Sequence, residues 1–299
     1  MSHIAFILHG KLRANNHLVS KIRSAFSPKF DLSFSYTEYS GHGIELAQNI
    51  SNSNADYIIA ITGDGTFNEV INGVMLSPNK KVKLGLLPHG TGNDFARMLG
   101  LTDDILALKK LIQNNSVKNI DVGLASFKNL EGKDASRYFI NISDVGLGGF
   151  IAKKLSGSSK WLGATLTFQW AIVSTFLTYK HQLMKIRTDD FLYEGKILSY
   201  IIANGKYFGG GLGIAPDAKP DDGLLEIVLA TEITLWEYLK NLTKIRACKK
   251  VEHPKMNYLR AKEIFVETEN QPIDMDGEFI GYSPMKISIV PHAIQILCP

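Results

Sequence analysis

The chain has few cysteines, and we expect no secretion signal among its first residues. Among its 299 residues only Cys248 and Cys298 are cysteines, which excludes a disulfide framework and a thiolate metal cluster. Residues 1–8 form an apolar run that is too short, and too uncharged at its front, for a signal peptide. We therefore expect a cytoplasmic protein.

A large excess of charge is also lacking. The formal net charge is +4 and the pI is near 8.8. This mildly basic balance suits an anionic ligand or an acidic membrane surface, and it is too weak to indicate a nucleic-acid partner. Apolar residues make up 45% and charged residues 21%, as in globular proteins. The length is sufficient for one large or two ordinary domains.

Long apolar runs are rare, with one exception. Residues 161–179 carry no charge over nearly the length needed to cross a bilayer. The run contains Gln169 and several threonines and serines, which favours a largely buried helix over a membrane span. A third alternative is that its exposed side rests on a membrane, because lysines flank the run at 153, 154, 160 and 180.

Strand and helix patterns alternate up to about residue 124, which predicts a parallel sheet covered by helices. Expected strands are 4–8, 32–36, 57–61 and 83–88, and expected helices include 18–26, 44–50 and 105–113. Later residues are β-rich, and only 161–179 and 235–242 resemble helices, which predicts an antiparallel sandwich or barrel. We expect domains at 1–124 and 125–299 with a cleft between them, and a return of the last few residues to the first domain as an alternative.

A glycine-bracketed acid follows the third expected strand, in Gly63–Val70 (GDGTFNEV). Glycines let the backbone approach an anion, and the first N–H groups of a helix favour negative charge. Asp64 would repel a bare phosphate, and its presence is explained if a divalent cation lies between the two. The alternative is that Thr66 and Glu69 form a capping box and that Asp64 is a turn residue.

A second loop of the same kind follows the fourth expected strand. His89–Asp94 (HGTGND) separates residues 83–88 from a helix that begins near Phe95. The two loops would place their aspartates at the carboxyl edge of one parallel sheet, where ligands bind in open α/β folds. The alternative is that Asn93 or Asp94 is an ordinary N-cap.

The second domain has acids of its own. If residues 274–278 form a strand, Asp274, Asp276 and Glu278 share one face and need solvent, a metal or a shared proton. The alternative is a solvated turn around Gly277. The turn at Asp221–Gly223 is either an ordinary turn or a place for a structural cation, bound by one carboxylate and nearby carbonyl groups.

Together these segments resemble the diacylglycerol kinase catalytic-domain family, specifically its soluble bacterial lipid kinases. The resemblance runs from about residue 4 to about residue 290, through 63–70, LPHGTGNDFAR at 87–97, the acidic turn within 204–226 and DGE at 276–278. It implies an α/β N-terminal domain like those of phosphofructokinases and NAD kinases, with a C-terminal β-sandwich. Two positions depart from the family pattern. His9-Gly10-Lys11 replaces the usual Asn-Pro-x-Ser-Gly loop, and Thr62 replaces a glycine.

The resemblance also implies site residues, with ATP and Mg²⁺ as cofactors. Implied nucleotide contacts are Thr37, Gly63, Asp64, Gly65, Thr66, Phe67, Asn68, Glu69 and Thr91. A structural Mg²⁺ would use the Asp222 side chain with the carbonyl groups of Lys219 and Leu224. The acids implied for an active-site Mg²⁺, partly through water, are Asp64, Asp94 and Asp121. The catalytic base belongs to the pair Asp276 and Glu278.

We therefore expect transfer of the γ-phosphate of ATP to a hydroxyl of a membrane lipid, diacylglycerol or a relative such as phosphatidylglycerol. The alternatives are a NAD kinase-like enzyme, against which the acidic elements of the second domain argue, and an inactive lipid-binding protein. The expected partner is lipid at the inner face of the membrane, with the protein bound peripherally, and a homodimer is left open. The basic run at 244–250 either touches the bilayer or is a solvated face.

Overall fold

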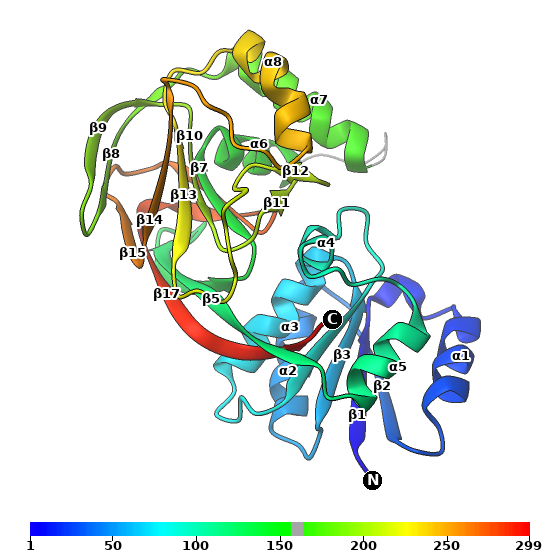
Figure 1. The fold of residues 1–299 in the computed structure, drawn as a ribbon. Helices are drawn as coiled ribbons and strands as arrows, with labels where there is room; N and C mark the ends of the chain where they lie inside the picture. The colour runs from blue at the N-terminus through cyan, green and yellow to red at the C-terminus, as the bar shows by residue number, and fades with distance from the viewer. Residues whose placement is uncertain (157–163) are drawn as a thin grey trace. The chain divides into compact units, whose positions relative to one another are not determined.

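The computed structural model describes residues 1–156 and 164–299 (Figure 1). The chain divides into two compact units. Unit 1 contains residues 1–120 and 292–299, and unit 2 contains residues 121–291. The chain passes from one unit to the other within two long strands, β5 (Val117–Lys128) and β17 (Glu278–Leu297).

Unit 1 is a parallel sheet with helices on both faces (Figure 1). Its strand order is β2-β1-β3-β4, and the end of β17 joins as a fifth parallel strand beside β4. All four expected strands are present. The bounds are β1 His3–Leu8, β2 Asp31–Tyr36, β3 Tyr57–Thr62, β4 Lys83–Pro88, α1 Asn16–Phe26, α2 His42–Ser51, α3 Asp64–Leu76, α4 Asp94–Leu99 and α5 Ile105–Gln113.

The core of unit 1 explains why these strands are apolar throughout. Every residue of β3 is buried, because a parallel sheet covered on both faces exposes neither. On one face, Phe6 and Ile59 pack in a cluster with Phe26 of α1 and Leu108 of α5. On the other face α2 contacts α3, and Gly73 permits this close approach. The packing fixes the strands, so the loops that leave them start from defined positions.

Unit 2 consists mainly of antiparallel strands. One run has the order β14-β13-β10-β7-β16-β17, and β17 also pairs with β15 and β5, which lead to β8, β9 and β6. Strands of both groups contribute to one apolar core. The bounds are β6 Asp134–Phe139, β7 Ile142–Gly146, β8 Gln182–Thr188, β9 Leu192–Ile197, β10 Ser199–Ala203, β11 Tyr207–Phe208, β12 Leu212–Gly213, β13 Leu225–Ala230, β14 Met256–Ala261, β15 Glu263–Val266 and β16 Pro272–Met275.

Three helices accompany the strands of unit 2: α6 (Leu147–Ser156), α7 (Ala164–Thr178) and α8 (Leu235–Arg246). Helices α7 and α8 confirm the two expected helical segments, although Trp161 lies outside the described residues. Helix α6 is unexpected from the sequence. Its Gly149 lowers helix propensity, but a Cβ there would collide with the carbonyl oxygen of Pro272 on β16. In the described part of the chain, no helix has the length and apolarity to span a membrane.

Candidate active site

The two glycine loops of unit 1 touch each other where β3 and β4 end. A Cβ added to Gly90 would lie 2.5 Å from the Cα atom of Gly63, so neither loop has room for a larger residue. A similar approach joins the ends of β1 and β2. The Gly10 N–H donates to the Thr37 hydroxyl at 3.0 Å, and a Cβ on Gly10 would collide with the Thr37 carbonyl oxygen. The prediction that both glycine loops lie at one sheet edge is confirmed.

Asp64 binds the start of helix α4. Its carboxylate accepts hydrogen bonds from the backbone N–H groups of Asp94 at 3.1 Å and Phe95 at 3.3 Å. Asn93 occupies the N-cap position in a left-handed conformation and makes no cap bond, because its side chain closes the loop onto Gly90. Asp64 of α3 therefore caps α4. The alternatives of a plain turn residue at 64 and an ordinary N-cap at 93 are wrong.

Glu69 caps helix α2 in the same way. Its buried carboxylate accepts hydrogen bonds from the N–H groups of Gly41 at 2.8 Å and Gly43 at 3.0 Å. The alternative of a capping box between Thr66 and Glu69 is wrong, because α3 already begins at Asp64. Hydrogen bonds to a charged group contribute about 1.5–3 kcal/mol each. Two acids of α3 thus hold the first turns of both neighbouring helices.

The other residues implied as nucleotide contacts differ in exposure. Thr91 is exposed, and Gly65 is half-buried at the start of α3. Phe67 and Asn68 are 0% and 1% exposed, and the Phe67 ring packs 5.6 Å from that of Phe95. Contacts from Phe67 and Asn68 would therefore come from their backbone. The nucleotide contacts themselves stay predictions.

In unit 2, residues 272–282 form a hairpin and not one continuous strand. Strand β16 ends at Met275, and β17 begins at Glu278. Asp276 and Gly277 between them have φ angles of 48° and 85°, as in a type I′ turn. The prediction that Asp274, Asp276 and Glu278 share one strand face is wrong, because the turn interrupts the two-residue period.

Asp276 lies in a cradle of backbone N–H groups. Its carboxylate accepts hydrogen bonds from Ile140 at 3.0 Å, Asn141 at 3.0 Å and Ile142 at 2.9 Å. Burial raises the pKa of Asp276 to about 6, and the three N–H groups oppose this rise. The alternative of a solvated turn is therefore wrong for this side chain. The contacts suit a role in holding the connection between β6 and β7.

Glu278 is placed differently. Its side chain is 39% exposed, and its carboxylate accepts a hydrogen bond from the Arg137 guanidinium at 2.7 Å. A carboxylate that is oriented by one cation and open to solvent can accept a proton from a substrate hydroxyl. Sequence alone does not predict Arg137 as the partner of Glu278, because 141 residues separate them.

The acidic turn of unit 2 is held by protein groups. The two oxygens of Asp222 accept hydrogen bonds from Leu224 N–H at 3.1 Å and from the Arg260 guanidinium at 2.6 Å. Asp121 is buried, accepts a hydrogen bond from Gly223 N–H at 2.6 Å and donates its own N–H to Pro220. The Asp222 carboxylate suits a hard cation, although Arg260 would compete with that cation.

Clusters of metal-binding side chains are absent from residues 1–156 and 164–299: no three His, Cys, Asp or Glu residues there are arranged to hold a metal ion. The predicted site at Lys219, Asp222 and Leu224 uses one side chain and two carbonyl groups, so it stays a prediction. In unit 1, Asp94 pairs with Arg97 at 2.9 Å.

Sequence alone also does not predict a pair of buried acids. Asp144 on β7 lies directly opposite Asp274 on β16, and the two residues are 2% and 8% exposed. Asp144 accepts a hydrogen bond from the Ser199 hydroxyl at 2.7 Å, whereas Oδ1 of Asp274 has no hydrogen-bond partner in the described structure. Burial raises the pKa of Asp144 to about 7. Burial and the charges of Asp144 and Asp276 raise the pKa of Asp274 well above its usual range. The sequence does contain one sign of this pair, because Asp144 is the one charged residue within 138–152.

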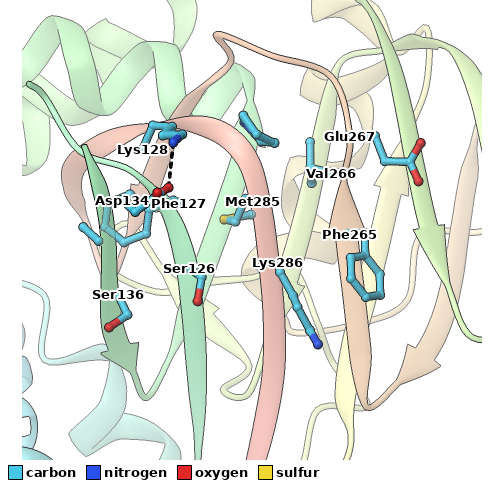
Figure 2. A pocket seen from close by; sticks show the side chains of 12 residues that line it. Ser126, Phe127, Lys128, Asp134, Ser136, Phe265, Val266, Glu267, Met285 and Lys286 are labelled. Atoms are coloured by element: carbon cyan, nitrogen blue, oxygen red, sulfur yellow. Dashed lines mark ion pairs between the residues drawn. The ribbon is translucent and has the colours of Figure 1, made fainter. Parts of the chain in front are cut away.

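A groove of about 580 Å³ crosses strands of unit 2 (Figure 2). At its edge Lys128 pairs with Asp134 at 2.7 Å. The groove contains none of the predicted site residues. It is lined by Ser126, Phe127, Lys128, Asp134, Ala135, Ser136, Phe265, Val266, Glu267, Pro284, Met285 and Lys286.

Two family models match the chain. The diacylglycerol kinase catalytic domain matches residues 3–125, and the YegS C-terminal NAD kinase beta sandwich-like domain matches residues 145–298. The chain belongs to the family of the YegS C-terminal domain, whose model covers more than half of it, and it carries a diacylglycerol kinase catalytic domain before that domain. The family resemblance and the predicted fold class are thereby confirmed. Membership makes the chain kinase-like and implies the use of a nucleotide.

Curated relatives agree with this membership. A diacylglycerol kinase of Staphylococcus saprophyticus is 29% identical over 90% of this chain and 86% of its own length. One of Staphylococcus carnosus is 28% identical over 90% and 85%. Two solved structures share the fold. A diacylglycerol kinase structure from Bacillus anthracis has a TM-score of 0.73 at 24% identity, over 100% of this chain and 97% of that one. Yeast NADH kinase has a TM-score of 0.50 at 12% identity, over 100% of this chain and 84% of that one.

Proposed function

We propose that the protein transfers the γ-phosphate of ATP to a hydroxyl group of a membrane lipid, diacylglycerol or a related lipid such as phosphatidylglycerol. The observation that supports this most is Glu278, an accessible carboxylate oriented by Arg137 in a chain of a kinase family. Phosphoryl transfer requires alignment and positive charge more than covalent help from the protein.

The donor half of the reaction is proposed for unit 1. The touching loops at Gly63 and Gly90 bring the starts of α3 and α4 together, and Asp64 links them. N–H groups at such helix starts bind phosphate oxygens. Asp64 and Asp94 are the acids of this unit that could hold a Mg²⁺, which when bound supplies positive charge to the phosphates.

The acceptor half is proposed for unit 2. Glu278 would accept the proton of the lipid hydroxyl as the new P–O bond forms and the bond from the γ-phosphate to ADP breaks, and Arg137 would keep its carboxylate in place. Asp276 would act as a positioning residue, because its carboxylate already accepts three backbone hydrogen bonds.

The reaction is testable with purified protein, γ-labelled ATP and a total lipid extract. We expect label in a lipid product that chromatography identifies, and no label in NAD when NAD is the sole acceptor. Label in NAD alone would establish the NAD kinase alternative. No transfer of label to an acceptor of either class would support an inactive lipid-binding protein.

A structural Mg²⁺ at Asp222 gives a separate prediction. If the cation binds there with the carbonyl groups of Lys219 and Leu224, Mg²⁺ should raise the Tm of the wild type by about 5 °C and leave Asp222→Ala unchanged. Arg260→Gln removes the competing cation and should increase the Mg²⁺ effect. Thermal unfolding of the three proteins with and without Mg²⁺ measures this. An equal shift in Asp222→Ala would place the cation elsewhere.

A further inference from the structure

Helices α7 and α8 lie side by side on unit 2 (Figure 1). Both helices carry large apolar side chains that are exposed to solvent. On α7, Trp170 is 67% and Leu177 is 72% exposed. On α8, Trp236 is 66% and Leu239 is 41% exposed. We call these four residues the docking face.

The docking face is a consequence of how the two helices pack. Their inward sides meet through the stacked rings of Phe176 and Tyr238, 5.3 Å apart, and through Ile172 and Ile245 in the core with α6. The four exposed residues therefore lie on the sides that the packing leaves out. Trp170 and Leu177 are seven positions apart, or about two turns, which puts them on one side of α7.

Lysines of α6 and α8 accompany the docking face. Lys240 lies one turn from Trp236, with its Nζ atom 5.5 Å from the indole ring, and Lys244 is exposed on the next turn. Lys154 of α6 donates to Ser174 of α7 at 2.9 Å. The one acid of α8, Glu237, is engaged by Thr234 and Lys255 in a capping box and an ion pair. The surface thus combines exposed indole and leucine side chains with lysines whose charge is not offset on α8.

We propose that the docking face binds the surface of an anionic lipid bilayer. Tryptophan suits the boundary between headgroups and acyl chains, and lysines beside an apolar helix face attract anionic headgroups. A second copy of the chain fits less well, because two faces of the same positive charge would repel each other. The inference rests on the proposed lipid substrate, since it states how the protein reaches that substrate.

The test is co-sedimentation with vesicles of phosphatidylcholine, with and without phosphatidylglycerol. The variant Leu177→Ser with Leu239→Ser should bind anionic vesicles about 10-fold more weakly than the wild type. The matched control is Leu183→Ser with Leu192→Ser, two leucines of unit 2 on β8 and β9 that are 70% and 60% exposed. This control should bind as the wild type does.

A second variant tests the charge. Lys240→Gln with Lys244→Gln should lose at least about 10-fold in binding to anionic vesicles and little in binding to neutral ones. Wild-type binding by the leucine variant, or equal loss in its control, would overturn the proposal. So would a wild-type dimer that the leucine variant converts to a monomer, because the face would then join two copies.

Kinase assays separate this inference from the proposed function. With diacylglycerol in anionic vesicles the leucine variant should be about 10-fold less active, and with a dispersed short-chain diacylglycerol it should equal the wild type. Equal loss on both substrates would indicate damage to the active site and would contradict docking. If the wild type phosphorylates neither lipid, the proposed function fails, while sedimentation still decides whether the face binds bilayers.

Discussion

Glu278→Gln is expected to lower lipid phosphorylation about 10³-fold and to leave ATP binding unchanged. Glutamine has the size of glutamate and an oxygen that still accepts the hydrogen bond from Arg137, which spans 2.7 Å in the wild type. It cannot take the proton of a substrate hydroxyl. Turnover with diacylglycerol and calorimetric titration with ATP would measure the two effects separately.

Asp276→Asn is the control for this assignment, and its expected defect is structural. An amide offers one acceptor oxygen to three backbone N–H groups and turns its own NH₂ group toward donors. Each buried group that loses its partner costs about 1–3 kcal/mol, so the Tm should fall by several degrees. An active Glu278→Gln enzyme, together with an inactive Asp276→Asn enzyme of unchanged Tm, would reverse the roles of the two acids.

The α/β half of the fold is predictable because its signals are local. Strands buried on both faces are continuous apolar runs, as Tyr57–Thr62 shows, and glycines mark the ends of β3 and β4. The close approach of Gly63 to Gly90 follows from two such strands being neighbours in one parallel sheet. The sequence pattern alone therefore predicts which edge of the sheet carries the candidate site.

The partners of the acids are not predictable in the same way, because they lie far apart in sequence. Glu69 caps helix α2 through the N–H of Gly43, 26 residues earlier, and Glu278 meets Arg137 across 141 residues. Only the folded sheet order brings such pairs together. The hairpin at Asp276-Gly277 is a different case. An Asp-Gly pair between apolar segments is a strong hairpin signal, and it outweighs the alternation of acids around it.

The buried pair of Asp144 and Asp274 makes the stability of unit 2 depend on pH in a way that its surface acids do not. Asp144 faces Asp274 on β16 and Ser199 on β10, and its charge also acts on Tyr179 beside α7. Its carboxyl group lies against Gly148 at the start of α6, where a Cβ would collide with it. Ionisation of Asp144 therefore places a charge in the core, beside the buried carboxyl group of Asp274.

Stability of the wild type is expected to fall as the pH rises from about 4 to about 7, and Asp144→Asn should remove much of this fall. The pKa of Asp144 is raised from 3.8 to about 7, so in this window the native protein holds a proton that the unfolded chain has lost. A state that binds more protons is destabilised relative to the other as the pH rises. Above pH 7 the loss of unfolding free energy that is due to Asp144 is complete, and its upper limit is about 4 kcal/mol.

The measurement is the difference in Tm between Asp144→Asn and the wild type, taken at pH 5 and at pH 8. Asparagine also changes the hydrogen bond with Ser199, but that cost is similar at both pH values and cancels in the comparison. We expect the Tm of the variant, relative to that of the wild type, to be about 5 °C higher at pH 8 than at pH 5. Asp134→Asn, at a residue whose side chain is 88% exposed in the same unit, is the matched control and should follow the wild type. Parallel curves for Asp144→Asn and the wild type would show that Asp144 is already ionised in the native core at pH 5.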